Sequence, residues 1–210
     1  LLPLVLLPLL GISELKVVSA NYGKPIIFLF LGGFLLALGL QRSGLHRRIA
    51  LSIVALIGSQ PRRLVLGFML ACYVLSMWIS NTASVMVMLP IALSVLSDIR
   101  ERSEEHAGRL GAPLMLGIAY AADIGGMATP VGTPPNLVFM EVLGDLFPNV
   151  PAPTFAQWMI MGVPLSAVFL LAGWYLLAWR LFRLPTEAVI ARGDAVRNAL
   201  RGLGPLTRDE

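Results

Sequence analysis

The sequence predicts an all-α integral membrane protein that contains a re-entrant helical hairpin and a discontinuous transmembrane helix. Three observations support this fold class. Hydrophobic residues make up 57% of the 210 residues and charged residues only 13%, which is more apolar surface than a soluble domain of this size could bury. The apolar residues fall into runs of helical length. Two short polar stretches interrupt these runs: Ser80-Asn81-Thr82, and the glycine- and proline-rich residues 125–136.

Charge and cysteine content limit the class of protein further. The 16 basic residues lie almost entirely between the apolar runs and give a net charge of +4. This distribution indicates membrane topology and lipid headgroup contact, and it argues against nucleic-acid binding. Cys72 is the one cysteine, so no intramolecular disulfide is possible and a packing role is expected. The chain starts at Leu1 without a basic n-region, so we expect a fragment that begins within a helix, with no signal peptide.

The arginines predict the topology. They cluster in 42–63, 98–109 and 183–210, whereas 142–155 has no basic residue. The positive-inside rule therefore places the three arginine-bearing segments in the cytoplasm, and 13–24 and 142–155 outside.

The elements of a single membrane domain, 1–210, follow in order. Residues 1–12 form a partial transmembrane helix, and 25–41 form a full one. Residues 45–58 have basic residues first and apolar ones after; they are too short to span, so we expect an interfacial cytoplasmic helix. After the two interrupted elements, 156–182 cross the membrane again, and 184–210 form a cytoplasmic segment.

The first interrupted element, 64–97, is predicted to be a re-entrant hairpin. It contains 34 residues without a charge, and basic residues flank both ends on the same predicted side. One helix of this length would measure about 51 Å, against a hydrocarbon core of about 30 Å. Each half is too short for a full span, so 64–79 rise, Ser80-Asn81-Thr82 form the tip, and 83–97 return.

The second interrupted element, 110–147, is predicted to be one broken transmembrane helix, because its flanks lie on opposite sides. Residues 110–122 and 136–147 are each too short to span but cross once together. Unwound backbone inside a bilayer must be buried in protein or line a cavity. The hairpin tip and this loop should therefore meet near mid-membrane, as half-helices aimed at an ion and an anion do in secondary transporters.

The residues at the hairpin tip suit both an anion and a cation. Asn81 or Thr82 can cap the returning helix, whose free N–H groups and positive dipole end favour negative charge. Ser76 and Ser80 are four residues apart, which would place both hydroxyls on one helix face beside the carbonyls that end the rising arm. Such hard oxygen ligands are appropriate to sodium.

The second break repeats this chemistry. Gly125, Gly126 and Gly132 permit close backbone approach. Thr133 followed by Pro134 predicts an N-cap with proline at the first helical position, which aims a second helix N-terminus at the site. Two such ends could hold a carboxylate or a sulfate without a fixed basic side chain.

At these motifs the chain resembles the divalent anion/sodium symporter family, which comprises dicarboxylate, citrate and sulfate transporters. The similar residues are 76–83 and 125–136, and 45–51 resemble the family's cytoplasmic surface helix. The resemblance implies that four residues border the substrate: Asn81, Thr82, Thr133 and Pro134. It also implies one sodium site formed by Ser76, Ser80, Asn81 and Gly132.

The resemblance implies more about architecture and activity. Family members contain two inverted repeats, move as elevators and function as homodimers, so the chain would supply one N-terminal repeat and half of the site, without the C-terminal repeat. The expected activity is cation-coupled symport of a small anion, with sodium as the coupling ion, no other cofactor and no enzymatic activity. We expect a multi-pass protein of a bacterial inner membrane.

Two positions depart from the family pattern. Asp123 lies where a small residue such as serine is expected, and Pro130 where an aliphatic residue is expected. An acidic group near the carbonyl end of a half-helix has the unfavourable dipole sign. Asp123 is therefore a candidate coupling residue, and proton coupling becomes conceivable.

Three other functions compete with this interpretation. An intramembrane aspartyl protease would use Asp123 but needs a second acidic residue at equal depth, and Glu141 and Asp145 lie toward the outer surface. An arsenite or proton antiporter of a related superfamily is the second alternative. The third is a fragment that is inert alone. The sequence leaves the identity of the anion open.

Overall fold

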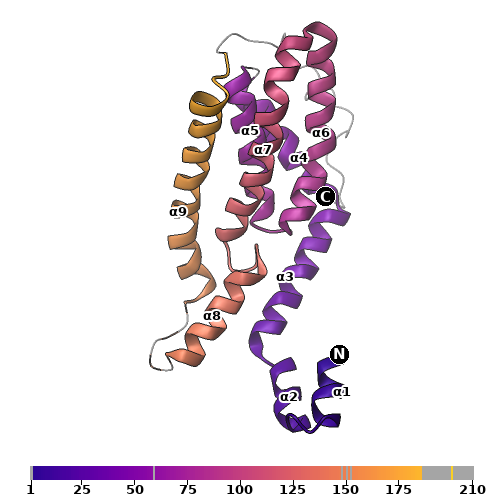
Figure 1. Ribbon diagram of the computed structural model, residues 1–210, viewed down its shortest axis with the longest axis vertical. Helices are drawn as coiled ribbons and strands as arrows, with labels where there is room; N and C mark the ends of the chain where they lie inside the picture. The colour runs from indigo at the N-terminus through magenta and orange to yellow at the C-terminus, as the bar shows by residue number, and fades with distance from the viewer. Residues whose placement is uncertain are drawn as a thin grey trace.

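The computed structural model describes residues 2–58, 60–147, 149, 151, 153–185 and 200. The predicted cytoplasmic segment 184–210 therefore lies almost wholly outside the described residues. In the described part of the chain the regular structure is helical throughout (Figure 1).

The helices follow the apolar runs of the sequence. In chain order they are α1 (Leu2–Leu9), α2 (Leu15–Tyr22), α3 (Pro25–Arg42), α4 (Leu45–Ile57), α5 (Pro61–Ser76), α6 (Asn81–Arg102), α7 (Glu104–Met127), α8 (Pro134–Leu146), α9 (Phe155–Tyr175) and a π-helical turn, η1 (Leu176–Leu181). Among the described residues, three helical stretches are long and apolar enough to cross a membrane: Asn81–Glu101, Glu104–Met127 and Phe155–Leu181. A fourth exists if α3 and α4, bent by 71° at their break, count as one.

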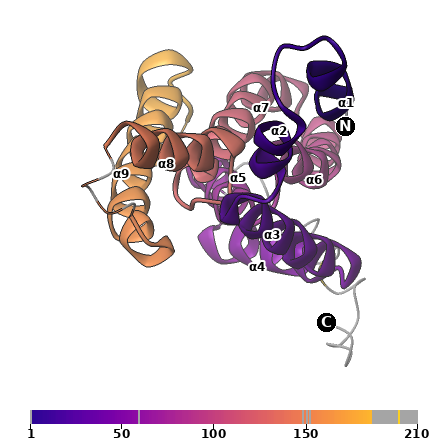
Figure 2. The same cartoon turned by 90° about the horizontal axis from the view of Figure 1, so that it is seen from below.

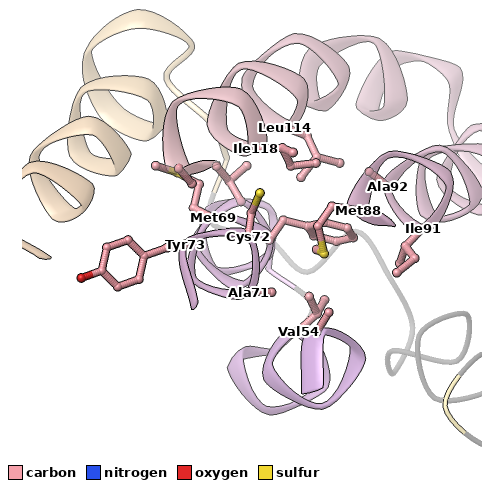
Figure 3. Packing of buried hydrophobic residues seen from close by; sticks show 14 of the residues in the cluster. Val54, Met69, Ala71, Cys72, Tyr73, Met88, Ile91, Ala92, Leu114 and Ile118 are labelled. Carbon is pink, nitrogen blue, oxygen red and sulfur yellow. The ribbon is translucent and has the colours of Figure 1, made fainter. Parts of the chain in front are cut away.

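The core forms around α5, which packs against α4, α6, α7 and α9 (Figure 2). After Arg63 this helix carries no charged residue, so nearly every side chain can be buried. Figure 3 shows Val54 of α4, Met88 of α6 and Ile118 of α7 around α5, which contributes Ala71 and Cys72. Because α5 is covered on several sides, it supplies a rigid base for the loop that follows it.

The helices that follow the first interruption and precede the second are longer than the uncharged runs predict. The expectation that each is too short to span alone is wrong, because Asn81–Glu101 and Glu104–Met127 are each long and apolar enough to cross a membrane. α6 has 22 residues and α7 has 24, and Ser103 alone separates them. The charged residues of 98–109 continue both helices, because Arg and Glu are good helix formers. Ser103 ends one helix and caps the next, since its Oγ accepts a hydrogen bond from the N–H of His106 at 3.4 Å. A short helix, α2, also occupies the segment 13–24 that the sequence analysis treats as a linker.

The two interruptions lie between the ends of the molecule. In Figure 1 the α6–α7 turn is at the top, α8 and α2 are at the bottom, and the two breaks are at middle height. At the lower end Lys24 forms an ion pair with Glu141 and lies 3.8 Å from Asp145. The hydrogen bond to the Glu141 carboxylate raises the pKa of Lys24. The start of α3 and the end of α8 therefore lie at the same end of the molecule.

Large apolar side chains are exposed on the outer helices. Exposed residues of α3 include Phe28, Leu35 and Leu36, and those of α8 include Val138 and Phe139. Figure 2 shows α3 and α8 on different sides of α5. Such faces suit acyl chains or further transmembrane helices, as the membrane prediction requires.

Candidate functional site

The first break is the loop Met77–Ser80 between α5 and α6. Ser80 is the N-cap of α6: its backbone is extended (φ −59°, ψ 149°), and its Oγ accepts a hydrogen bond from the N–H of Ala83 at 3.3 Å. The expectation that Asn81 or Thr82 caps this helix is therefore wrong, because both already belong to its first turn. The expectation that Ser76 and Ser80 share one helix face is also wrong, because α5 ends at Ser76.

The second break is the loop 128–133 between α7 and α8. Thr133 is the N-cap of α8, with extended backbone (φ −144°, ψ 140°), and Pro134 begins the helix, which confirms the predicted position of the cap; the Thr133 side chain makes no capping hydrogen bond. Pro134 and Pro135 lack an N–H, so two of the donors that usually point out of a helix N-terminus are missing here. To a bound anion, the N-terminus of α8 can therefore offer mainly its positive dipole end and the Thr133 hydroxyl, with fewer backbone N–H groups than usual.

A buried threonine joins the two breaks. The Thr129 hydroxyl donates a 2.6 Å hydrogen bond to the carbonyl oxygen of Met77 in the first loop. The Oγ1 of Thr129 in turn accepts a 3.0 Å hydrogen bond from the N–H of Gly132. Thr129 is fully buried, so the two bonds satisfy its polar group where water cannot. No role was predicted for Thr129, because a single threonine in a glycine- and proline-rich loop gives no local signal of such a contact.

Two further side chains, which had no predicted role, hold the carbonyl end of α7. The Nδ2 of Asn136 donates to the carbonyl oxygens of Gly126 and Thr129, both at 2.8 Å. The Nε1 of Trp158, from α9, donates to the carbonyl oxygen of Met127 at 3.1 Å. The last carbonyls of a helix have no partner within the helix, so these bonds let α7 end inside the protein.

Glycines allow the helices beside the two breaks to approach one another closely. A Cβ on Gly125 would lie 2.4 Å from the carbonyl oxygen of Tyr73 in α5. A Cβ on Gly126 would lie 2.6 Å from the Oδ1 of Asn81, and one on Gly132 would lie 2.6 Å from the carbonyl oxygen of Gly126. Any larger residue would separate the segments, so glycine is required for the contact and not for its freedom of φ.

Neutral oxygens converge at this contact. The Oδ1 of Asn81 lies 2.8 Å from the Oγ of Ser76. The Gly132 Cβ position is 3.0 Å from the carbonyl oxygen of Ser76. In the described part of the chain no three His, Cys, Asp or Glu side chains come together. Hydroxyl, amide and carbonyl oxygens fit a hard monovalent cation better than a transition metal.

Both breaks also line one recess of about 180 Å³ beside α3. The lining includes Ser80 and Trp78 from the first loop, and Gly132 and Pro134 from the second. Of the residues predicted to border the substrate, Pro134 lies in this lining, whereas Asn81, Thr82 and Thr133 lie outside it. Thr82 and Pro134 are exposed, and Asn81 and Thr133 are half-buried.

Asp123 contacts the hairpin directly. Its Oδ1 accepts a 3.0 Å hydrogen bond from the Nδ2 of Asn81. The carboxylate thus lies beside the oxygen cluster, on the exposed side of α7. A neutral residue was expected here, and the contact gives the acidic side chain a partner 42 residues away in the chain.

Comparison with known proteins agrees with these motifs. The family model described as "Citrate transporter" matches residues 1–201. The sodium-dependent dicarboxylate transporter SdcS of Staphylococcus saprophyticus is 39% identical over 215 residues, which cover 100% of this chain and 41% of the relative. SdcS of Staphylococcus aureus is 39% identical over 219 residues, with the same coverage.

The chain spans about two fifths of the length of the curated relatives it matches. Those relatives are transporters, and they come from bacteria. Together with the apolar helices, this makes the chain a multi-pass protein of the cell membrane. The match over residues 1–201 includes both interruptions, so the resemblance inferred from the motifs is confirmed, and the chain belongs to the citrate transporter family.

Proposed function

We propose that the chain forms half of the binding site of a cation-coupled transporter for a divalent anion. The anion would be a C4-dicarboxylate, citrate or sulfate, and the coupling ion would be sodium. The names of the relatives support this choice, since both are sodium-dependent dicarboxylate transporters. The observation that carries the proposal is the junction of the two breaks through Thr129 and Gly132.

The cation would bind where the two breaks meet. Asn81 supplies an amide oxygen, Ser76 a hydroxyl and a carbonyl oxygen, and Gly132 the backbone that allows the approach. Ser80 contributes from the end of the first loop. These oxygens carry no formal charge, so the site would attract sodium without the very tight binding that several carboxylates produce.

The anion would bind beside the cation, at the N-termini of α6 and α8. α6 offers backbone N–H groups near Asn81 and Thr82, together with a positive dipole end. α8 offers its dipole and the Thr133 hydroxyl, because Pro134 and Pro135 have no N–H to donate. A bound cation would supply the remaining positive charge, which explains why no arginine is needed and why uptake would depend on sodium.

The other half of the site would come from a second, inverted repeat, in a protein that dimerises and moves as an elevator. The apolar grooves of this chain support such a partner. One groove of about 540 Å³ lies between α8 and α9 and includes Phe139, Trp158 and Phe169. Further transmembrane helices would cover it.

Uptake of labelled succinate by the full-length transporter in liposomes tests the proposal. We expect Asn81→Ala and Thr82→Ala to abolish sodium-dependent uptake, because one removes a cation ligand and both alter the N-terminus of α6. Ser97→Ala is the matched control: it lies on the same helix, is exposed and is far from the tip, so uptake should be unchanged. Full uptake in Asn81→Ala and Thr82→Ala would refute the proposed site. Uptake driven by a pH gradient without sodium would instead support proton coupling.

A further inference from the structure

A chain of three polar side chains controls how Asn81 faces the proposed cation site. The Oγ of Ser76 lies 2.8 Å from the Oδ1 of Asn81, and the Nδ2 of Asn81 lies 3.0 Å from the Oδ1 of Asp123. Ser76 belongs to the rising arm of the hairpin, Asn81 to the returning arm and Asp123 to α7. The three elements that form the site therefore meet in one hydrogen-bonded chain.

The amide of Asn81 has two ends, and only one of them can bind a cation. Its oxygen accepts hydrogen bonds and its NH₂ group donates them. In the observed orientation Oδ1 is the end nearest Gly126, at 2.6 Å from the Cβ position there, whereas Nδ2 is at 3.3 Å. If the amide turned over, its NH₂ group would face the site, and its hydrogens would repel a cation.

The carboxylate of Asp123 selects between the two orientations. A carboxylate only accepts hydrogen bonds, so it attracts the NH₂ end of Asn81 and repels the amide oxygen. Ser76 cannot make this selection, because its hydroxyl can either donate to an oxygen or accept from an NH₂ group. A charge-assisted bond is also stronger than a bond between neutral groups. The orientation of Asn81 therefore depends on Asp123.

We propose that Asp123 is a positioning residue, which holds the Oδ1 of Asn81 toward the cation site and so sets the affinity for sodium. This inference rests on the proposed function, and it concerns a residue that touches the cation ligand and not the cation. It explains why an acidic side chain is tolerated near the carbonyl end of a half-helix, where the dipole disfavours it.

Ser76 completes the arrangement. Its hydroxyl lies 2.8 Å from the Oδ1 of Asn81 and 2.6 Å from the carbonyl oxygen of Ala122, but it has only one proton to donate. When a cation binds the Oδ1 of Asn81, the proton can turn to the carbonyl oxygen of Ala122. Two oxygens, Oδ1 of Asn81 and Oγ of Ser76, then face the cation, and no buried donor loses its partner.

Variants at Asp123 test the inference in the full-length transporter in liposomes, with succinate uptake measured over a range of sodium concentrations. Asp123→Ala removes the acceptor, so we expect the half-saturating sodium concentration to rise about tenfold. Asp123→Asn loses the charge but keeps an amide oxygen that can accept from Asn81, so the rise should stay within about threefold. In both variants the KM for succinate at saturating sodium should change less than about twofold.

The controls separate positioning from charge and from folding. Asp123→Leu keeps a branched side chain and has no acceptor, so it should match Asp123→Ala. Glu104→Gln removes a charge at the far end of α7 and should leave the sodium dependence unchanged. Equal shifts in Asp123→Asn and Asp123→Ala would overturn the inference in favour of a simple charge effect, and no shift in either would overturn it outright. If the wild-type protein takes up neither succinate nor citrate nor sulfate with sodium, the proposed function itself fails.

Discussion

The contact between α5 and α7 gives a stability prediction that can be worked out from distances. Gly125→Ala would place a Cβ 2.4 Å from the carbonyl oxygen of Tyr73 and 2.9 Å from its Cα. These obstacles are backbone atoms, so no side-chain rotation relieves them and α7 must shift. Overpacking of this kind costs about 1–3 kcal/mol or more. Alanine recovers about 1 kcal/mol through its helix propensity, so a net destabilisation of up to about 2 kcal/mol is expected.

Gly111→Ala is the matched control, because it makes the same substitution in the same helix. The Cβ position at Gly111 has no described atom within 4 Å. Without a clash, the gain in helix propensity remains, up to about 1 kcal/mol. The two substitutions should therefore change stability in opposite directions.

The reactivity of Cys72 can be used to measure the stability of these variants. It is the one cysteine of the chain and is fully buried, so a maleimide fluorophore should react with it only after unfolding. The midpoint of the reaction on heating in detergent then reports stability. We expect Gly125→Ala to lower the midpoint and Gly111→Ala to leave it unchanged or raise it. Equal midpoints for the two variants would refute the close approach of α7 to α5.

Three further predictions concern other contacts. Thr129→Val keeps the shape of the side chain but removes the hydroxyl that joins the breaks, so stability should fall by about 1–3 kcal/mol and sodium-dependent uptake should fall with it, whereas Thr129→Ser should resemble the wild type in both measurements. The pKa of Lys24 is raised above its ordinary value of 10.5, so the ion pair with Glu141 stabilises the folded state below pH 10.5, and this stabilisation is lost as the pH rises through the folded-state pKa. The wild type and Lys24→Met should therefore differ slightly in chemical-denaturation midpoint, by a constant amount from about pH 7 to 9, and the difference should vanish in strong alkali. The Arg62 guanidinium lies 4.8 Å from the ring centre of Trp179. Arg62→Ala should therefore lower the free energy of unfolding by about 1 kcal/mol more than Arg63→Ala does, which would appear as a lower midpoint of the Cys72 reaction.

Patterns local in sequence predicted the helices well. The interruption predicted at Ser80-Asn81-Thr82 is found, since α5 ends at Ser76 and α6 begins at Asn81. That the two helices form a re-entrant hairpin stays a prediction, because Asn81–Glu101 is long and apolar enough to span alone. Thr133-Pro134 predicted the start of α8, because proline at the first helical position is a strong local signal. The glycines of the second break predicted close backbone approach, which the Tyr73 and Gly126 contacts bear out.

The choice of helix cap and the contacts between the two breaks depend on long-range contacts, which the sequence does not predict. Ser80, Asn81 and Thr82 are all acceptable caps, and only the fold selects Ser80. Thr129 bonds a carbonyl 52 residues away, and no spacing rule predicts such a pair. The joint between α6 and α7 was missed because the sequence reading ended both helices where charges begin, although arginine and glutamate continue helices well.

Sodium binding to the joined breaks can be measured with the same Cys72 reaction in the full-length protein, after any cysteine outside residues 1–210 is replaced by serine. A ligand that binds only the folded state stabilises it by about 2.7 kcal/mol at one hundred times its dissociation constant. We predict that sodium chloride raises the reaction midpoint relative to choline chloride in the wild type and in Ser97→Ala, and that Asn81→Ala abolishes this shift. A sodium shift of full size in Asn81→Ala would show that the cation binds elsewhere.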